Sequence, residues 1–394
     1  MAKARHPKVS GIHWRLLGAA FLSAIVAFWS PVAPTQEPPK RTLEVAAGTL
    51  HVETVAAGLS YPWSLIFLPD GDMLVSEKHP GRLRRVSPDG SVGDPIDGLP
   101  EIFSEGNGGL LGLALDPDFE ANSLIYFAYS EPGENGTSGL SVGRGRLAEG
   151  RLEEVETIWR QSPKVEDVRN FGGRLTFAPD GRLFVMTGDR FAHDLVQDPS
   201  NTIGVIARIE RNGDIPPDNP FVDTEGYDPS IWSWGHRNIG GGAMHPETGQ
   251  LWIHEFGPWG GDELNIPEAG ENHGWPVVSW GRHYSGETIP DPPMRPEFAS
   301  SIFHWTPVIS PSGMIFYGGS EIPAWKGNLL IGGLSSQSLF RLTLRGETVI
   351  GEERIEFGAR IRDLTEGPDG AVYLLTDQPY GEIFRLRLEK AIGQ

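Results

Sequence analysis

The sequence predicts an all-β fold, a six-bladed β-propeller, and three observations lead to this prediction. The chain of 394 residues contains 51 glycines and 33 prolines, which break helices and mark turns. A hydrophobic fraction of 39 % with 10 % aromatic residues is sufficient for a folded core. A turn followed by an alternating strand recurs along the chain, as in radial β repeats. We therefore expect one ring of blades in place of the two or three domains that the length alone suggests.

The recurring unit is an apolar residue, a Pro-Asp-Gly turn and a strand, first seen in residues 67–77. Similar units occupy residues 115–119, 177–185, 244–253 and 366–375, and a degenerate copy in residues 314–333 fits the widest gap. Their spacing is roughly 50 to 65 residues, and such units must stack to bury both faces of their sheets. The strand-like residues 43–55 are predicted to complete the last blade. No linker-like composition interrupts residues 45–388, and we expect residues 41–394 to form one propeller domain.

Residues 1–40 have the pattern of a signal peptide or signal anchor followed by a Pro-rich linker. Lys3, Arg5, Lys8 and Arg15 precede the apolar residues 16–29. A core of this length fits a secretory signal better than a spanning helix, which needs about 20 apolar residues. Ala33 is followed by Pro34, a poor cleavage site, so an uncleaved membrane anchor stays open as an alternative. Either alternative predicts a periplasmic or otherwise extracytoplasmic body, secreted or anchored.

Composition and missing motifs exclude several classes of function. The absence of Cys excludes disulfides, a thiol nucleophile, thiolate metal sites and iron–sulfur clusters. A net charge of −19, without a basic stripe, argues against nucleic acid as a partner. No Walker loop, dinucleotide fingerprint or HExxH motif is present. Residues 139–143 match GxSxG, but they lie in a strand-like stretch with no following helix and are predicted to be part of a strand.

Propellers bind ligands at the mouth of the central channel, where loops from every blade meet. Several predicted mouth loops are rich in glycine and fixed polar residues. These loops are residues 105–112, 169–174, 235–242, 254–263 and 359–363. Arg360 and Arg362 alternate on one strand and could pair with Asp363 or Glu366. Two like charges on one face at a channel mouth favour an anionic ligand instead.

A series of short motifs spans residues 50–388 in a fixed order. They are Tyr61-Pro-Trp-Ser, Gly108-Gly-Leu-Leu, Phe171-Gly-Gly-Arg-Leu, Gly213-Asp-Ile-Pro-Pro-Asp-Asn-Pro-Phe, Gly235-His-Arg-Asn, Gly257-Pro, Gly261-Asp-Glu-Leu-Asn-Ile, Asn272-His-Gly-Trp-Pro and Arg360-Ile-Arg-Asp. In these motifs the chain resembles the soluble quinoprotein glucose and aldose sugar dehydrogenases, which are glucose/sorbosone dehydrogenase-like propellers. The resemblance implies oxidation of an aldose C1 hydroxyl by hydride transfer to pyrroloquinoline quinone (PQQ). It also implies a Ca²⁺ against the quinone, a sugar substrate and an electron acceptor.

The resemblance assigns roles to matching positions. Arg237 and Asn238 match the pair that contacts the quinone, where Arg237 stabilises developing charge. Arg360 and Arg362 match two arginines that hold cofactor carboxylates, a role suited to forked guanidinium groups. The carbonyl oxygens of Gly257 and Pro258 match the ligands of the metal, hard donors fit for Ca²⁺.

The sequence departs from the family at other positions. Asn170 stands where the family has its general base, a His, and an amide does not accept a proton near neutral pH. Asn107 replaces an assisting Gln, and Phe256 a polar residue. Ser335 stands at the place of a cofactor-binding Lys. The sequence neighbours that could supply another base are Glu166, Asp167 and His254.

Two other functions stay open beside a periplasmic PQQ-dependent sugar dehydrogenase. The first is a Ca²⁺-dependent lactonase or esterase, because Asn107, Asn170 and Asn238 could line the channel with neutral oxygen ligands. The second is a carbohydrate-binding propeller that has lost the base and does not catalyse.

Overall fold

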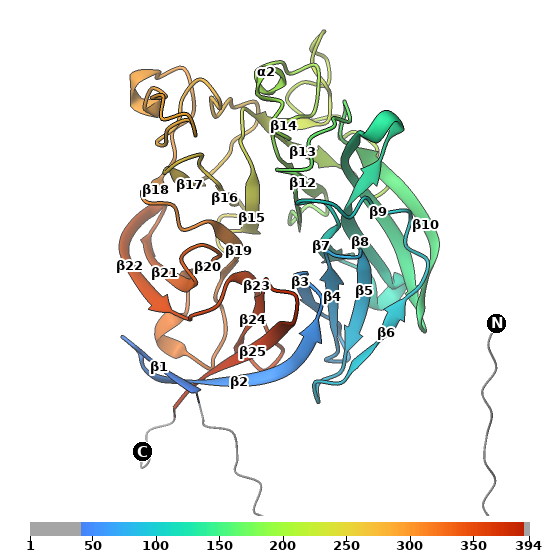
Figure 1. The fold of residues 1–394 in the computed structure, drawn as a ribbon, viewed down its shortest axis with the longest axis vertical. Coiled ribbons are helices and arrows are strands. Elements are labelled where there is room, and N and C mark those ends of the chain that lie inside the picture. The colour runs from blue at the N-terminus through green and yellow to red at the C-terminus, as the bar shows by residue number, and fades with distance from the viewer. Residues whose placement is uncertain (1–40, 390–394) are drawn as a thin grey trace, which may run out of the picture. The chain divides into compact units, whose positions relative to one another are not determined.

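The computed structural model describes residues 41–389, which form six antiparallel sheets arranged in a ring (Figure 1). The predicted six-bladed propeller is therefore confirmed. The predicted signal or anchor, residues 1–40, lies outside the described residues. Among the described residues, no helix has the length and apolar character needed to cross a membrane.

Each blade begins at the central channel and proceeds outward, strand by strand, through antiparallel hairpins. Blade 1 contains β3 (Pro62–Phe67), β4 (Met73–Glu77), β5 (Arg82–Val86) and β6 (Val92–Ile96). Blade 2 contains β7 (Leu110–Leu115), β8 (Leu124–Pro132), β9 (Ser138–Ala148) and β10 (Arg151–Arg160). Blade 3 contains β11 (Gly172–Phe177), β12 (Leu183–Thr187), β13 (Val205–Ile209) and β14 (Ile231–Trp234). The GxSxG match lies inside β9, as predicted.

The second half of the ring follows the same plan. Blade 4 contains β15 (Ile239–Met244), β16 (Leu251–Glu255), β17 (Asp262–Asn265) and β18 (Phe303–Trp305). Blade 5 contains β19 (Pro311–Phe316), β20 (Leu329–Gly333), β21 (Ser338–Arg345) and β22 (Thr348–Glu356). Blade 6 contains β23 (Ile361–Glu366), β24 (Val372–Thr376), β25 (Gly381–Leu388), β2 (Gly48–Leu59) and β1 (Arg41–Val45). The helical elements are α1 (Phe119–Asn122), α2 (His193–Val196) and 3₁₀ turns at Glu134–Gly136, Pro292–Met294 and Pro323–Trp325.

The ring closes by pairing the two ends of the described chain. Strand β2 lies antiparallel to β25, with Leu50 opposite Leu388 and Val52 opposite Leu386. Figure 1 shows β1 and β2, in blue, beside the red β25. The prediction that residues 43–55 complete the last blade is borne out by this pairing.

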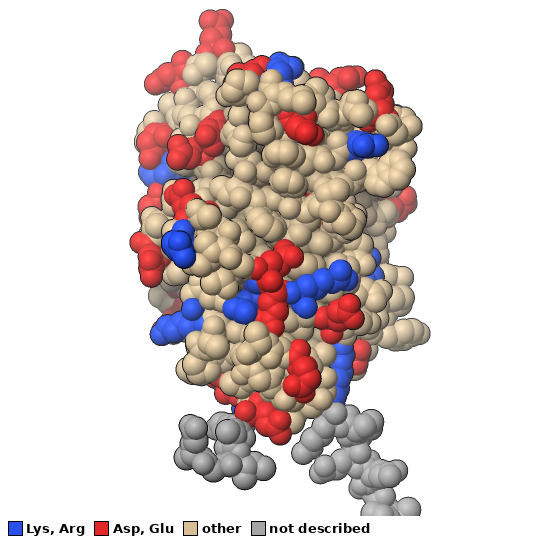
Figure 2. Space-filling model, turned by 90° about the vertical axis from the view of Figure 1, so that its left-hand side faces the viewer, with Lys and Arg blue, Asp and Glu red and all other residues tan. Residues whose placement is uncertain are grey.

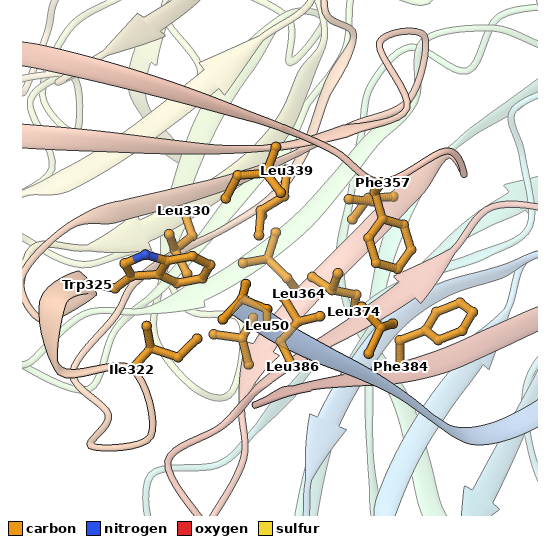
Figure 3. Close-up of a cluster of buried hydrophobic side chains, with 14 of the residues drawn as sticks. Leu50, Ile322, Trp325, Leu330, Leu339, Phe357, Leu364, Leu374, Phe384 and Leu386 are labelled. Atoms are coloured by element: carbon orange, nitrogen blue, oxygen red, sulfur yellow. The ribbon is translucent and has the colours of Figure 1, made fainter. Parts of the chain in front are cut away.

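Hydrophobic side chains fill the space between neighbouring sheets. The cluster between blades 5 and 6 includes Leu50, Trp325, Leu330, Leu364 and Leu374, all nearly inaccessible to solvent (Figure 3). Burial of each such side chain contributes about 1.5 to 3 kcal/mol. Because each blade shares its core with both neighbours, the ring holds the mouth loops at fixed relative positions.

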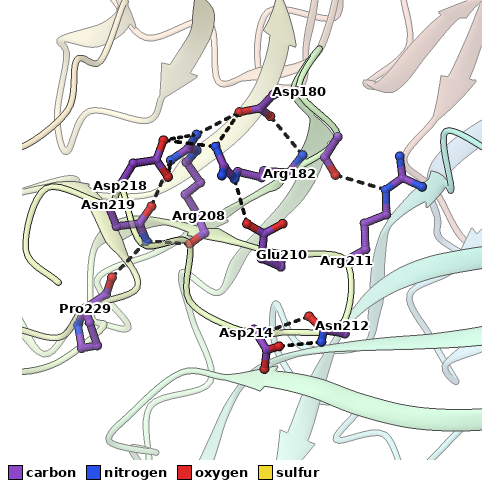
Figure 4. Close-up of polar contacts among 11 residues, drawn as sticks. Asp180, Arg182, Arg208, Glu210, Arg211, Asn212, Asp214, Asp218, Asn219 and Pro229 are labelled. Atoms are coloured by element: carbon purple, nitrogen blue, oxygen red, sulfur yellow. Dashed lines mark hydrogen bonds and ion pairs between the residues drawn. The ribbon is translucent and has the colours of Figure 1, made fainter.

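Polar contacts fix the long connection between β13 and β14. Arg208 donates to Asp180 over 2.9 Å and to Asp218 over 3.2 Å, and Asn219 donates to the carbonyl oxygens of Arg208 and Pro229 over 2.9 Å each (Figure 4). The segment 213–221, one of the family motifs, is thus anchored to the edge of blade 3. Elsewhere on the surface, acidic and basic side chains lie interspersed on the face drawn in Figure 2.

A buried ion pair spans the channel below the mouth. Arg174 at β11 donates to Asp363 of β23 over 3.0 Å, and the other Asp363 oxygen accepts the N–H of Leu65 over 2.9 Å. The Arg174 guanidinium also lies 4.5 Å from the ring centroid of Trp63. Blades 1, 3 and 6 are therefore linked across the channel axis.

Candidate active site

A cavity of about 550 Å³ lies at the channel mouth and receives residues from all six blades. Its walls are mainly residues next to the start of first strands or the end of second strands, because these ends face the same side of the ring. The structure brings together eight of the residues predicted for the site. They are Asn107, Asn170, Arg237, Asn238, Gly257, Pro258, Arg360 and Arg362.

One wall of the cavity is cationic. Arg360 donates to a single oxygen of Asp377 through Nη2 over 2.8 Å, and Arg362 donates to the same oxygen over 2.9 Å. The suggested ion-pair partners Asp363 and Glu366 are therefore wrong for these arginines. Lys78 lies in the same wall and feels the charges of all three residues. Asp377 is the one carboxylate among these three cationic groups and pairs only with the two arginines, so two positive charges lack a counter-ion within this group.

Asp377 is held as an anion by these neighbours. Burial alone raises the pKa of its carboxyl group, but the charges of Arg362 and Lys78 and the hydrogen bond from Arg360 outweigh burial and bring the pKa far below its usual range. Asp377 thus fixes the two arginines without cancelling the positive potential of the wall. This arrangement suits a ligand with several negative charges.

On the opposite wall, the predicted asparagines are tightly hydrogen-bonded. Asn170 has a φ of 49° and donates through Nδ2 to Asp189 over 2.9 Å. Its backbone N–H donates to the Asn107 side-chain oxygen over 3.2 Å, and the Asn238 side-chain oxygen accepts the N–H of Gly172 over 3.1 Å. Two of the three predicted neutral oxygen ligands therefore already accept backbone hydrogen bonds.

Asp189 is fully buried behind Asn170. It also accepts a hydrogen bond from the indole N–H of Trp275 over 2.8 Å, and Nε2 of His193 lies 3.3 Å away. Burial raises the pKa of Asp189, but the contact with His193 and the charge of Arg237 lower it by more. A carboxylate of this kind can orient a side chain at position 170.

Arg237 connects this wall to the predicted metal ligands. One of its terminal nitrogens donates to the carbonyl oxygens of Phe256 and Gly257 over 2.9 Å each, and the other donates to the Tyr284 hydroxyl over 3.1 Å. Asp262 accepts the N–H of Gly257 over 2.8 Å, and its second oxygen accepts N–H groups at the start of blade 5. Asp262 therefore shapes the turn that presents Gly257 and Pro258.

Other predicted residues lie away from the cavity. Ser335 is not among the lining residues, and its hydroxyl lies 2.8 Å from that of Ser310, which does line the cavity. Glu166, Asp167 and His254 do not line it either. Burial lowers the pKa of His254 to about 3, assisted by the charge of Arg174. His254 is therefore neutral, enclosed and unsuited to serve as the replacement base.

Lys78, Asp189 and Asp377 belong to the site but were not predicted from the sequence. The internal repeat contains a signal that could have found them. An acidic residue lies at or just after the end of the second strand in several blades: Glu77 in blade 1, Asp189 in blade 3, Glu255 in blade 4 and Asp377 in blade 6. Counted from the Pro of each turn (Pro69, Pro179, Pro246 and Pro368), these acids follow 8, 10, 9 and 9 residues later, so aligning the blades places them within two positions of one another, with Lys78 next to the first of them.

Comparison with known proteins agrees with this geometry. The family model described as Glucose / Sorbosone dehydrogenase matches residues 59–385. The aldose sugar dehydrogenase YliI of Escherichia coli K12 is 38 % identical over 352 residues, covering 87 % of this chain and 94 % of the relative. A solved glucose dehydrogenase superposes with a TM-score of 0.83 at 42 % identity, over 86 % of this chain and 99 % of the other.

A ligand-bound relative is also similar. The PQQ-bound aldose sugar dehydrogenase of Streptomyces coelicolor has a TM-score of 0.72 at 29 % identity, over 86 % of this chain and 98 % of the other. The similarity in sequence and in propeller fold thus extends over nearly the whole described chain. The chain belongs to the glucose/sorbosone dehydrogenase family and is a sugar dehydrogenase-like oxidoreductase.

Proposed function

We propose that this protein binds PQQ in the mouth cavity and uses it to oxidise the C1 hydroxyl of an aldose or a related sugar. The observation that most strongly supports the proposal is the division of the cavity into two walls. Arg360, Arg362 and Lys78 offer excess positive charge on one side, and Arg237 and Asn238 lie on the other. PQQ has carboxylates to meet the first wall and a quinone to meet the second.

The residues present fit this cofactor. The Nε atoms of Arg237 and Arg362 are buried and have no hydrogen-bond partner among the described residues. A cavity of about 550 Å³ falls within the range of roughly 300 to 1,000 Å³ for sites that hold small molecules. Trp63, Phe171 and Phe256 supply apolar surface to the walls and limit the access of water. When bound, PQQ supplies the acceptor for the hydride.

The chain itself performs the remaining tasks. Arg360 and Arg362 hold the cofactor carboxylates, and Asp377 keeps both guanidinium groups oriented. Arg237, fixed by the backbone and by Tyr284, offers a cation where negative charge develops. The amide of Asn170 cannot take the hydroxyl proton, so we expect proton removal to limit turnover in this protein.

We further propose that Ca²⁺ binds at the carbonyl oxygens of Gly257 and Pro258. Hard oxygen donors on a turn fixed by Asp262 support this assignment. The Gly257 carbonyl currently accepts a hydrogen bond from Arg237, so the ion competes with one of the two carbonyl contacts of that guanidinium. The proposal also requires an external electron acceptor to complete the redox balance. The basic and apolar pattern of residues 1–29 supports action in the periplasm or at the outer face of the membrane.

The Ca²⁺-dependent hydrolase fits the cavity less well. It needs Asn107, Asn170 and Asn238 as oxygen ligands, and two of these oxygens already accept backbone N–H groups. A carbohydrate-binding protein without catalysis gives no reason for the excess positive charge of one wall, because an aldose is neutral.

The decisive experiment adds PQQ and Ca²⁺ to purified apoprotein, and then follows cofactor binding by absorbance and the reduction of a dye by aldoses. Sugar-dependent dye reduction that requires PQQ supports the proposal. Absence of PQQ binding at micromolar concentration would refute it. Opening of a lactone with Ca²⁺ alone would establish the hydrolase instead.

A further inference from the structure

We propose that Lys78 is a cofactor-holding residue, whose ammonium group supplies the third positive charge for the carboxylates of PQQ and makes cofactor retention dependent on pH. The inference rests on the proposed function and goes beyond it, because the family resemblance places no role on this position. It places a cofactor-binding Lys in blade 5, where this chain has Ser335. Lys78 enters the same cavity from blade 1.

The backbone and the side-chain stem of Lys78 are held in place. Lys78 directly follows β4, and the residue is 9 % exposed. Its carbonyl oxygen accepts the Ser104 hydroxyl over 3.1 Å. Gly109, with a φ of +147°, lies so close that a Cβ there would fall 2.6 Å from Cγ of Lys78. A side chain at position 109 would displace the lysine, so the glycine keeps its path to the cavity open.

The ammonium end of Lys78 is not matched by the protein. Among residues 41–389, its Nζ makes no hydrogen bond and no ion pair, and lies 5.9 Å from the ring centroid of Tyr61. The one carboxylate facing it, Asp377, is already bonded by Arg360 and Arg362. A largely buried lysine in the wall of a cavity, whose ammonium group has no acceptor of its own, is well placed to bind an anion that arrives from outside.

The charged groups around Lys78 are Arg362 and Arg360 from blade 6, Asp377 at the end of β24, and the adjacent His79. Burial lowers the pKa of Lys78 to about 8, the two arginines lower it too, and Asp377 opposes them. The pKa of His79 is lowered by burial and by Lys78, so His79 adds little charge at neutral pH.

These charges fix the direction of the pH effect. The empty site loses the Lys78 proton near pH 8, whereas a bound polycarboxylate stabilises the ammonium form. Binding above that pH must therefore take up a proton, and PQQ affinity falls by up to about tenfold per pH unit. Below pH 7 the lysine is charged in both states, and its contribution is constant.

The test measures PQQ binding to apoprotein by quenching of tryptophan fluorescence between pH 6.5 and 9.5. Lys78→Met removes the charge at similar length, and Lys78→Arg keeps a charge that does not titrate in this range. Lys326→Met, an exposed lysine outside the cavity, is the matched control. Circular dichroism melting verifies that each variant is folded.

We expect Lys78→Met to weaken binding at pH 7 by about 10- to 100-fold, as for loss of one charge-assisted contact. Lys78→Arg should bind PQQ with an affinity within a few-fold of wild type at pH 7, and its affinity should not decline above pH 8. Lys326→Met should have the wild-type PQQ affinity at every pH. If Lys78→Met does not fold, the different pH profiles of Lys78→Arg and wild type decide the matter.

Equal affinity of folded Lys78→Met and wild type would overturn the inference, and so would parallel pH profiles of Lys78→Arg and wild type. These results leave the proposed function standing, because wild type still binds PQQ. If wild type does not bind PQQ at any pH, both the proposed function and the role of Lys78 are refuted.

Discussion

Replacing Asn170 by His should accelerate sugar oxidation, because the site retains the support that a base at this position needs. Asn170 donates to the buried carboxylate of Asp189 over 2.9 Å. An imidazole at position 170 can place one ring nitrogen against Asp189 and direct the other into the cavity. The φ of 49° at this position falls in the left-handed region, where His, like Asn, is several-fold enriched, so the exchange adds little backbone strain.

The expected gain follows from the step that the imidazole restores. A positioned general base contributes about 10² to 10⁴ in rate, and we expect kcat to rise by about 10², equivalent to about 2.7 kcal/mol of barrier. We place the gain at the lower end because the cavity is built around the smaller Asn side chain. The rate of the variant should increase with pH between about 6 and 8, as the imidazole loses its proton.

The assay is dye reduction at saturating PQQ, Ca²⁺ and aldose, with PQQ affinity measured separately. Asn170→Gln is the control, since it enlarges the side chain without adding a base. No gain in kcat for Asn170→His, at wild-type PQQ affinity, would show that proton removal does not limit turnover or that the sugar lies elsewhere in the cavity.

Three other predictions concern stability and substrate binding. Asp363→Ala leaves Arg174 buried without its partner and should lower the free energy of unfolding, measured by urea titration, by about 3 to 5 kcal/mol. The double variant with Arg174→Met should recover much of this loss, and a loss below 1 kcal/mol for Asp363→Ala would contradict the prediction. His254 is neutral in the folded protein and gains a proton on unfolding below pH 6.5, so its burial should lower the free energy of unfolding by up to about 1.4 kcal/mol per pH unit as the pH falls. His254→Leu should therefore reduce the pH dependence of the urea midpoint between pH 7.5 and 5, and an unchanged pH dependence would contradict this. Trp259 is 64 % exposed and lines the cavity, so Trp259→Ala should raise the KM for sugar several-fold at unchanged PQQ affinity, and an unchanged KM would remove Trp259 from the sugar site.

The architecture could be predicted because each blade contains its own local signal. A Pro-Asp-Gly turn followed by alternating apolar residues specifies a hairpin without reference to the rest of the chain. The repeat then determines the number of blades, and residues 43–55 could be placed because they are strand-like and precede the first repeat. The structure divides them between β1 and β2, which also pair with each other.

The site was predictable where a residue belongs to a motif, as for Arg237 and Arg362. It was not predictable where a residue acts through a neighbour distant in sequence. Asp377 is a single acid at a strand end, and only the ring places it against Arg360 and Lys78. Ser335, which matches a cofactor-binding position of the family, does not line the cavity, whereas Lys78 of blade 1 does. Matching positions within one blade does not predict such a residue, because six blades contribute to the cavity.

The pairing of β2 with β25 sets the order in which the protein can become functional. The ring stays open until the final strand has been synthesised, and Arg360, Arg362 and Asp377 belong to this last blade. An incomplete chain therefore offers neither a closed cavity nor its cationic wall. If the protein binds PQQ as proposed, cofactor loading must come after synthesis and closure, and a chain that ends before β23 should not bind it.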